Sequence, residues 1–324
     1  MSKQDYLAKS GEKIQTIEEH TQEVLNSLDS LLSVYGSFFT DKEKQLFRLA
    51  CEYHDLGKMN KKFQDKLRKK LRKIYDELPH GVVSVFFLDK KKLLAEGLSI
   101  EEFRCLVTAI MHHHTRRFDL GSVNLRQYVK EFVQQQANDY FGVSTFRLFP
   151  NNVNVCLFND DKVLSYNHQE WLKYVLIKGI LNKADYNASN PKELLIERQI
   201  PTGEASLKHA ILAQVGTSLY PAQAFLRDHS EENVVLVAPA GSGKTEGSLL
   251  WAGESKTFFA LPLKVSSNSI YDRVRNRYGF EEVALLHSDA LSYQMESENE
   301  EVDVVFQRYE EMQGLSPSGC RGGP

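Results

Sequence analysis

HDLGKMNKKFQ, from His54 to Gln64, is the stretch of this sequence that says most about its fold. It begins with an imidazole next to a carboxylate, at the end of an apolar pattern that predicts a helix over residues 41–56 with Gly57 as its stop. A carboxylate can bind metal through one oxygen or through both, and it can therefore bridge two cations. One histidine beside one bridging aspartate suits a two-metal site.

More imidazoles and a second carboxylate come from other predicted helices of the same half. Helices that pack as a bundle can direct such side chains toward one point. A set of imidazole and carboxylate ligands favours Mn, Fe, Co, Ni or Zn over Mg or Ca. The alternative is a helical domain with scattered histidines, because a lone histidine is usually a core or surface residue. The additional candidate ligands are His20, His80, His112, His113, His114 and Asp185.

The N-terminal half is predicted to be mainly helical. Thr16 and Glu19 form the pattern of a capping box ahead of an apolar helix, and Ser99 and Glu102 form a second one. Apolar residues recur at helical spacing after each of these starts. Residues 115–165 are less regular and are assigned to no element. The predicted helices begin near residues 16, 41, 80, 99 and 170.

The character of the sequence changes near residue 190, where Asn190-Pro191 predicts a linker. Residues 233–239 and 257–262 are short apolar runs of the kind that form buried strands, and helices are predicted to start near Lys244 and Ser266. Strand, loop, helix and strand in this order indicate the beginning of a parallel α/β sheet.

The loop after the first of these strands is APAGSGKT, from Ala238 to Thr245. It matches the phosphate-binding pattern of nucleoside triphosphatases, with alanine in the first place. In this pattern the backbone amides surround the phosphates, Lys244 contacts the β and γ oxygens, and Thr245 can hold Mg²⁺. The expected nucleotide-binding residues are Gly241, Ser242, Gly243, Lys244 and Thr245.

The composition is that of an ordinary globular protein with roughly two domains. The chain has 324 residues and a net charge of −3, so no global basic field indicates nucleic acid. Its four cysteines form no Cys-x-x-Cys pair, which argues against a zinc ribbon and against a disulfide framework. The N-terminus lacks the apolar core of a signal peptide, and the most apolar run, residues 82–88, is too short to span a bilayer. We expect a cytoplasmic protein without a membrane partner.

A basic segment follows the His-Asp pair. Residues 58–73 contain nine Lys or Arg and one acid, Asp65, with apolar residues interleaved at helical spacing. One interpretation is a solvated helix face. The other is a surface that follows the phosphates of a nucleic-acid strand toward the metal site.

The histidine and aspartate motifs resemble those of the HD-domain phosphohydrolases. The strings at residues 54–64, 109–115 and 182–189 most resemble one branch, the CRISPR-associated nuclease-helicases of type I systems. The resemblance covers about residues 14 to 290. It implies a helical HD domain that binds two divalent transition metals (Mn, Fe, Ni or Co) and degrades single-stranded DNA.

Carried over by position, the resemblance implies that Asp55 is shared by both metals and takes part in catalysis. It implies that Lys58, near the pair, steadies a phosphate oxygen, although a solvated lysine is the alternative. In the family the histidine doublet precedes a small residue, usually glycine, and Thr115 stands in that place. This favours His113 with His114 and leaves His112 with His113 open. The implied ligands are His20, His54, Asp55 and Asp185 for one metal, and Asp55, His80, His113 and His114 for the other.

The later motifs resemble those of superfamily 2 helicases. Residues 260–264 resemble a strand-contacting motif, residues 285–290 a later segment of the same lobe, and Gln223 the glutamine that reads adenine. No Asp-Glu-x-Asp or Asp-Glu-x-His string follows Lys244, and no second lobe is present. We therefore expect a shortened or fragmentary helicase part that binds ATP and Mg²⁺ weakly, hydrolyses ATP poorly and is of low stability.

The sequence thus predicts a mainly α HD-domain bundle over residues 1–195, a partial α/β RecA-like (P-loop) lobe over residues 196–313 and a disordered tail over residues 314–324. The expected function is cleavage of single-stranded DNA in CRISPR interference by a monomer that a guide-RNA surveillance complex recruits. One alternative is an HD phosphohydrolase that acts on nucleotides or cyclic dinucleotides. Another is a shortened binder without catalytic activity.

Overall fold

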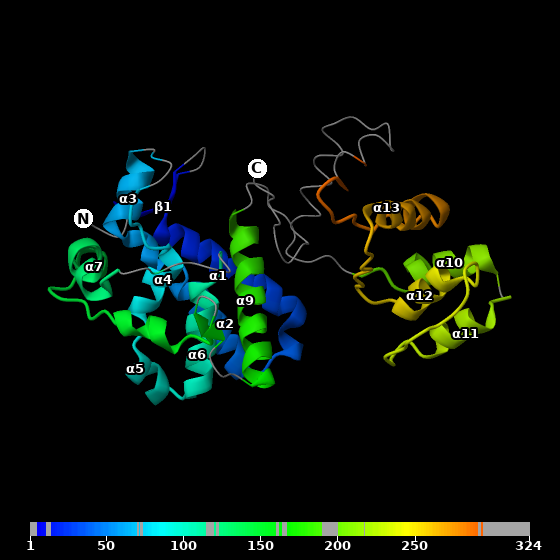
Figure 1. The fold of residues 1–324 in the computed structure, drawn as a ribbon, viewed down its shortest axis with the longest axis horizontal. Helices are drawn as coiled ribbons and strands as arrows, with labels where there is room; N and C mark the ends of the chain where they lie inside the picture. The colour runs from blue at the N-terminus through cyan, green and yellow to red at the C-terminus, as the bar shows by residue number, and fades with distance from the viewer. Residues whose placement is uncertain are drawn as a thin grey trace. The chain divides into compact units, whose positions relative to one another are not determined.

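In a computed structural model of the chain, residues 5–10, 14–69, 71, 74–114, 120, 123–159, 162–163, 167–189, 200–216, 218–290 and 293 are described. The chain divides into two compact units, Met1–Glu197 and Arg198–Pro324, and each is described by itself (Figure 1). The expected tail over residues 314–324 lies outside the described residues. Within the described part, no helix is both long and apolar enough to cross a membrane.

Four helices form the bundle of the first unit: α1 (Ile17–Tyr35), α2 (Asp41–Tyr53), α6 (Ile100–Met111) and α9 (His168–Ser189). The long helix α9 lies against α1, α2 and α6, and α2 also contacts α1 and α6 (Figure 1). Both predicted capping boxes are confirmed, because Thr16 and Glu19, and likewise Ser99 and Glu102, exchange the two expected hydrogen bonds. The prediction of a mainly helical first half is therefore confirmed.

The remaining elements of this unit are short. They surround the bundle and include two antiparallel pairs of strands, β1 with β2 and β3 with β4. They are β1 (Leu7–Lys9), β2 (Gln15–Thr16), η2 (Gly36–Phe38), η3 (Leu56–Met59), α3 (Lys61–Arg68), α4 (His80–Ser84), η4 (Val85–Phe87), α5 (Lys90–Ala95), α7 (Leu125–Phe132), α8 (Gln134–Phe141), η5 (Pro150–Val155), β3 (Phe158–Asn159) and β4 (Lys162–Val163).

One apolar cluster runs through the first unit and joins all four bundle helices. Phe47, Phe86 and Phe103 are among its largest fully buried side chains. Each such side chain contributes on the order of 1.5–3 kcal/mol through burial. This core fixes the directions of the helices, and so the places where their polar ends meet.

The turn after α2 differs from the prediction. The helix ends at Tyr53, and residues Leu56–Met59 form a separate 3₁₀ turn, η3, so Gly57 is not the stop of α2. The backbone of Gly57 instead contacts that of α4. A Cβ at this position would lie 2.0 Å from His80 O and 2.6 Å from Ser84 N. Gly57 N donates to Ser84 Oγ (2.8 Å), which donates to His54 O (2.6 Å). Glycine is needed here because two backbone segments meet without room for a side chain.

We expect Gly57→Ala to destabilise the protein, because neither backbone segment can move without disturbing the packed core. Overpacking of this kind costs about 1–3 kcal/mol. The matched control is Gly179→Ala in the middle of α9, where a Cβ meets nothing within 4 Å. Alanine should be neutral or stabilise that helix by up to about 1 kcal/mol. Thermal unfolding followed by circular dichroism compares the two, and equal melting temperatures would contradict the close approach at Gly57.

The second unit has a smaller core, formed by Ile211, Leu249, Leu250, Val274 and Tyr278. The helix predicted to start near Lys244 is confirmed, and the one predicted near Ser266 begins slightly earlier, at Lys264. The described elements of this unit are η6 (Gly203–Ala205), α10 (Leu207–Val215), α11 (Pro221–Asp228), α12 (Lys244–Ala252), α13 (Lys264–Asp272) and the π-turn η7 (Arg273–Arg277).

The two strands predicted for this unit are wrong. Residues 233–239 and 257–262 belong to no strand, and the described residues of the unit supply no paired backbone to either segment. Val235 and Val237 are 93 % and 94 % exposed, whereas Val234 and Leu236 are partly buried. The alternation is that of a strand covered on one side, but without a partner's hydrogen bonds no ladder forms. The described residues of this unit therefore form no parallel sheet, and the RecA-like lobe stays a prediction.

Candidate metal centre

The His-Asp pair lies at the buried end of α2. His54 is the C-terminal cap of that helix and Asp55 begins the turn into η3; they are 0 % and 1 % exposed. His54 Nδ1 lies 2.8 Å from the carbonyl oxygen of Cys51. When Nδ1–H donates to a carbonyl, the lone pair of a neutral imidazole is on Nε2. His54 therefore presents Nε2 to the interior of the bundle.

A first cluster forms where α1 and α9 pass this turn. His20 Nε2 lies 3.0 Å from Asp185 Oδ1, and His54 Nε2 lies 3.9 Å from the same oxygen. Asp55 Oδ2 is 3.3 Å from both imidazole nitrogens. One ligand atom from each of His20, His54 and Asp185 lies within 4.8 Å of the others.

A second cluster forms on the other side of Asp55. His80 begins α4, and His113 and His114 follow the end of α6. The Nε2 atoms of His80 and His113 are 3.1 Å apart, and Asp55 Oδ1 lies 3.4 Å from the first and 4.0 Å from the second. Ligand atoms of His80, His113 and His114 lie within 4.8 Å of one another.

Asp55 thus stands between two groups of imidazoles. Its Oδ2 atom faces His20 and His54, and its Oδ1 atom faces His80 and His113. Lys58, one turn further along the chain, places its Nζ 2.7 Å from Asp55 Oδ2. From the sequence, Lys58 is expected near the pair as a contact to a phosphate oxygen, and its ion pair with Asp55 is not predicted.

The electrostatics favour an anionic carboxylate at Asp55 and neutral imidazoles at His80 and His113. Burial raises the pKa of Asp55, but the charges of His54 and Lys58 outweigh it and hold this pKa well below its usual range. Burial lowers the pKa of His80 to about 3, and burial together with the neighbouring histidines lowers the pKa of His113. A neutral imidazole and an ionised carboxylate are the forms that bind metal.

Some buried polar atoms at the site have no hydrogen-bond partner within the described part of the chain and are available as metal ligands. Among the described residues, His54 Nε2 and Asp55 Oδ1 have no hydrogen-bond partner. Unsatisfied buried polar atoms are costly, and these two belong to the adjacent residues His54 and Asp55. Burial lowers the pKa of His54, yet Asp55 and Asp185 more than offset this and raise it, so the field favours a positive charge. Nitrogen and oxygen donors with this geometry fit two transition-metal cations.

The three consecutive histidines at residues 112–114 differ in burial and in their contacts with the site. His113 is 5 % exposed, and its Nδ1 lies 2.6 Å from Ile110 O, which directs Nε2 toward Asp55. His114 is more open, and its Nε2 lies 3.9 Å from Asp185 Oδ2. His112 caps α6 and belongs to neither of the two clusters found among the described residues. The structure thus brings His113 and His114 to the site.

Lys9 is a neighbour of the site that the sequence did not indicate. It lies on β1, and its Nζ donates to Ser189 Oγ (2.7 Å), which donates in turn to Asp185 Oδ1 (3.4 Å). Burial lowers the pKa of Lys9, while the nearby Asp185 acts to raise it. Lys9 lies in no recognisable motif, and its contact with Ser189 joins residues 180 positions apart. The local sequence pattern therefore could not predict that Lys9 lies near the site.

The basic segment has fewer available charges than its sequence suggests. On α3, Lys62 Nζ donates to the carbonyl oxygens of Tyr75 and Asp76, and Lys66 forms an ion pair with Glu77. Lys69 pairs with Asp65. These local contacts favour the helix-face interpretation over that of a surface that follows phosphates, and residues 70, 72 and 73 lie outside the described residues.

The phosphate-binding loop of the second unit has a compact conformation. Gly241 and Gly243 have φ values of 78° and 75°, and Lys244 Nζ donates to the carbonyl oxygens of Ala238 (2.8 Å) and Pro239 (2.6 Å). Ser242 Oγ donates to Pro239 O (2.8 Å), and Thr245 lies in the first turn of α12.

Gln223 lies beneath the same loop. It is 3 % exposed, and its Nε2 donates to Gly243 O (3.2 Å) while its Oε1 accepts from Tyr220 N (3.0 Å). These contacts place Gln223 beside the loop, and its amide supports the backbone there.

If the clusters bind cations, Mn²⁺ added to metal-free protein should raise its melting temperature. A ligand at a hundred times its Kd stabilises by about 2.7 kcal/mol. Asp55→Asn removes the charge shared by both clusters and should abolish the shift, whereas the control Asp29→Asn, which affects only a surface pair with Arg48, should keep it. The shift should weaken from pH 7.5 to 5.5, because a proton on His54 blocks Nε2. Equal shifts for both variants would contradict the assignment.

Comparison with known proteins agrees with this geometry. Residues 15–193 match the family described as Cas3, HD domain. The chain is 25 % identical over 344 residues to the CRISPR-associated nuclease/helicase Cas3 of Methanothermobacter thermautotrophicus, an alignment that covers 85 % of this chain and 40 % of that protein. It is 25 % identical over 289 residues to a protein of Methanocaldococcus jannaschii that carries the same name provisionally, covering 72 % and 39 %.

The chain spans about two fifths of the length of these relatives. No solved structure matches it significantly.

Proposed function

The chain belongs to the Cas3 HD-domain family, and from this premise we propose that it is a metal-dependent nuclease that cuts single-stranded DNA in CRISPR interference. The observation that supports the proposal most is the position of Asp55, whose two oxygens face two separate imidazole clusters. A carboxylate shared in this way suits the paired cations that cut phosphodiesters.

Each protein group has a distinct part in the proposed reaction. When bound, two cations would supply a hydroxide near neutral pH and neutralise the attacked phosphate. His20, His54 and Asp185 would hold one cation, His80, His113 and His114 would hold the other, and Asp55 would be shared by both. The buried members of this set, among them His20, His54 and Asp55, are held by the packed bundle before substrate arrives, so they need little reorganisation during the reaction.

Two lysines are suited to hold the substrate. Lys58 is buried with its Nζ against Asp55, so a phosphodiester oxygen that approaches Asp55 meets a positive charge. Lys9 lies on the Asp185 side and is partly exposed. Both can donate charge-assisted hydrogen bonds to a non-bridging oxygen.

The proposed partners follow from the relatives' names. Those proteins are described as CRISPR-associated, which supports recruitment of this chain by a guide-RNA surveillance complex that exposes a single DNA strand. The second unit is proposed as the beginning of a helicase lobe that binds ATP with Mg²⁺. A bound nucleotide would draw Lys244 away from the carbonyl oxygens of Ala238 and Pro239 that it now contacts.

Circular single-stranded DNA tests the proposed activity. With Mn²⁺ or Ni²⁺ the wild-type protein should convert the circle to fragments on a denaturing gel, and Asp55→Asn should lower the rate by at least about 10³-fold, because a shared ligand supports both metals. Asp29→Asn should cut normally. Release of phosphate from nucleotides or cyclic dinucleotides with an intact circle would contradict the proposal and indicate a phosphohydrolase. An intact circle with no product from either substrate would indicate a binder.

Lys58→Met tests the substrate-holding role, because methionine keeps the length of the side chain without its charge. We expect kcat/KM for a single-stranded oligonucleotide to fall about 10- to 100-fold, the loss of one charge-assisted hydrogen bond of about 1.5–3 kcal/mol. Lys61→Met, three residues further on an exposed position of α3, is the matched control and should change little. Equal activity of the two variants would show that Lys58 does not contact substrate.

A further inference from the structure

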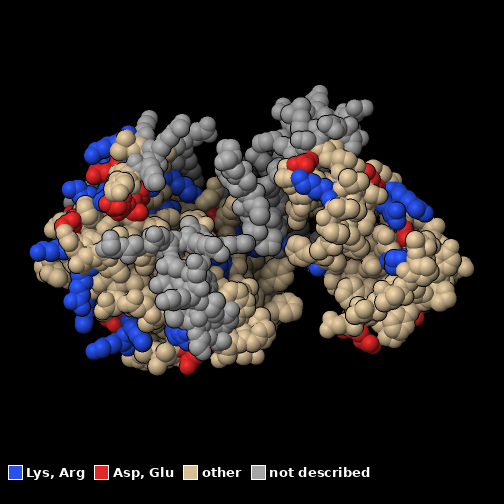
Figure 2. Space-filling view, in the orientation of Figure 1, with Lys and Arg blue, Asp and Glu red and all other residues tan. Residues whose placement is uncertain are grey.

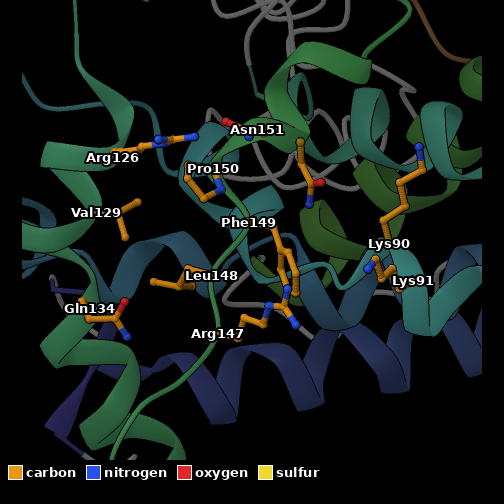
Figure 3. A pocket seen from close by; sticks show the side chains of 11 residues that line it. Lys90, Lys91, Arg126, Val129, Gln134, Arg147, Leu148, Phe149, Pro150 and Asn151 are labelled. Atoms are coloured by element: carbon orange, nitrogen blue, oxygen red, sulfur yellow. The ribbon is translucent and has the colours of Figure 1, made fainter.

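A second candidate site lies in the first unit, and none of the described residues that line it is a histidine. A cavity of about 530 Å³ opens between the start of α5, the helices α7 and α8, and the segment that leads into η5 (Figure 3). Four cationic side chains line it: Lys90, Lys91, Arg126 and Arg147. The size is within the usual range for ligand pockets.

The wall of this pocket is held firmly. Phe149 N donates to Phe86 O (2.7 Å), and the buried Asn152 donates to the carbonyl oxygens of Val85 and Leu88 (2.8 Å each). On the other side, Gln134 Nε2 donates to Phe146 O (2.8 Å). The segment that carries Arg147 is therefore fixed to the core at both ends, and the pocket is a preformed feature.

Within the described part of the first unit, the lining of this pocket carries an excess of positive charge. Among the described residues that line it, none is acidic, and none of its four cations forms an ion pair with a described carboxylate. The guanidinium of Arg147 lies 5.2 Å from the centroid of the Phe149 ring, and in Figure 3 it and the amine of Lys91 extend toward each other beside that ring. Figure 2 shows Lys and Arg side chains gathered over the α5–α7 side of this unit.

The floor of the pocket is apolar. Val129, Leu148, Phe149 and Pro150 line it together with the cations. A small inorganic anion would use the charges but would leave the apolar surface uncovered. A nucleotide residue within a strand uses both, because its phosphates meet cations and its base covers apolar and aromatic surface. The pocket contains no histidine, cysteine or carboxylate among its described residues, so it can bind but has no groups for cleavage.

From this juxtaposition the geometry points to a second nucleic-acid site: the pocket formed by Lys91, Arg126, Arg147 and Phe149 binds the sugar-phosphate backbone of a single strand, independently of the metal centre. Two or three phosphates are neutralised there, and one base lies against the apolar floor. The site holds the strand to the HD unit whether or not the metal centre is loaded, and it adds a positioning contact to the proposed nuclease.

The experiment measures binding of single-stranded DNA while EDTA removes metal ions, so that no cleavage can occur. A 5′-fluorescein-labelled oligo(dT) of twelve nucleotides is titrated with the whole chain in EDTA, and fluorescence anisotropy gives Kd. The variant Lys91→Glu/Arg147→Glu should raise Kd at least tenfold. It should also flatten the dependence of log K on log[salt] by about 1.4, since each phosphate contact on a single strand contributes about 0.7.

The matched control is Lys92→Glu/Lys130→Glu. Lys92 is the next residue of α5, where it pairs with Glu96, and Lys130 is exposed on α7; neither lines the pocket. This pair makes the same change in net charge, so a general field effect would weaken binding equally. We expect a change in Kd of less than threefold. A single substitution on the opposite wall, Arg126→Glu, should weaken binding by itself, and circular dichroism checks that every variant is folded.

Equal Kd values for the pocket pair and the control pair would overturn the inference. So would competition by dTMP as effective, per nucleotide, as that by unlabelled oligo(dT), because the pocket would then hold a mononucleotide. The result is separate from that of the cleavage test. If the pocket substitutions weaken binding but the DNA circle stays intact with Mn²⁺, only the proposed nuclease activity is contradicted. If the circle is cut but the pocket substitutions leave Kd unchanged, only this inference is contradicted.

Discussion

The carboxylate of Asp55 is the feature on which the rest of the first unit depends. It is 1 % exposed, and a buried charge of this kind is strongly destabilising unless positive groups surround it. Lys58 is a direct ionic partner, and four histidine nitrogens face the two oxygens at distances from 3.3 to 4.0 Å. Such an arrangement is unfavourable for a plain hydrophobic core and favourable for a site that takes up cations.

Two close backbone contacts in the bundle bring two of these imidazoles to Asp55. The absence of a side chain at Gly57 lets η3 touch α4, which brings His80 toward Asp55. Gly81 has a similar part, since a Cβ there would lie 2.7 Å from Met111 O, close to the end of α6 that precedes His113. Both glycines bring backbones together so that short imidazole side chains can meet across helix ends.

Much of the first unit follows from its sequence because its signals are local. The capping boxes at Thr16 and Ser99 and the apolar periodicity fix where helices start, and the histidine motifs identify the side chains that the structure gathers. Gly57 was misassigned because its close approach is a tertiary contact, and Lys9 reaches the site only through a strand pairing. The strands near Val235 and Phe258 were wrong because an apolar run forms a strand only if paired backbone is present, which a short pattern does not show.

The most direct test of the shared carboxylate is anomalous X-ray scattering from a crystal soaked in Mn²⁺. Two peaks are predicted on opposite sides of Asp55, about 3.5–4 Å apart. His20, His54 and Asp185 should surround one, His80, His113 and His114 should surround the other, and one oxygen of Asp55 should touch each. No peak beside Asp55, or a single peak that Asp55 does not contact, would contradict the two-cation site.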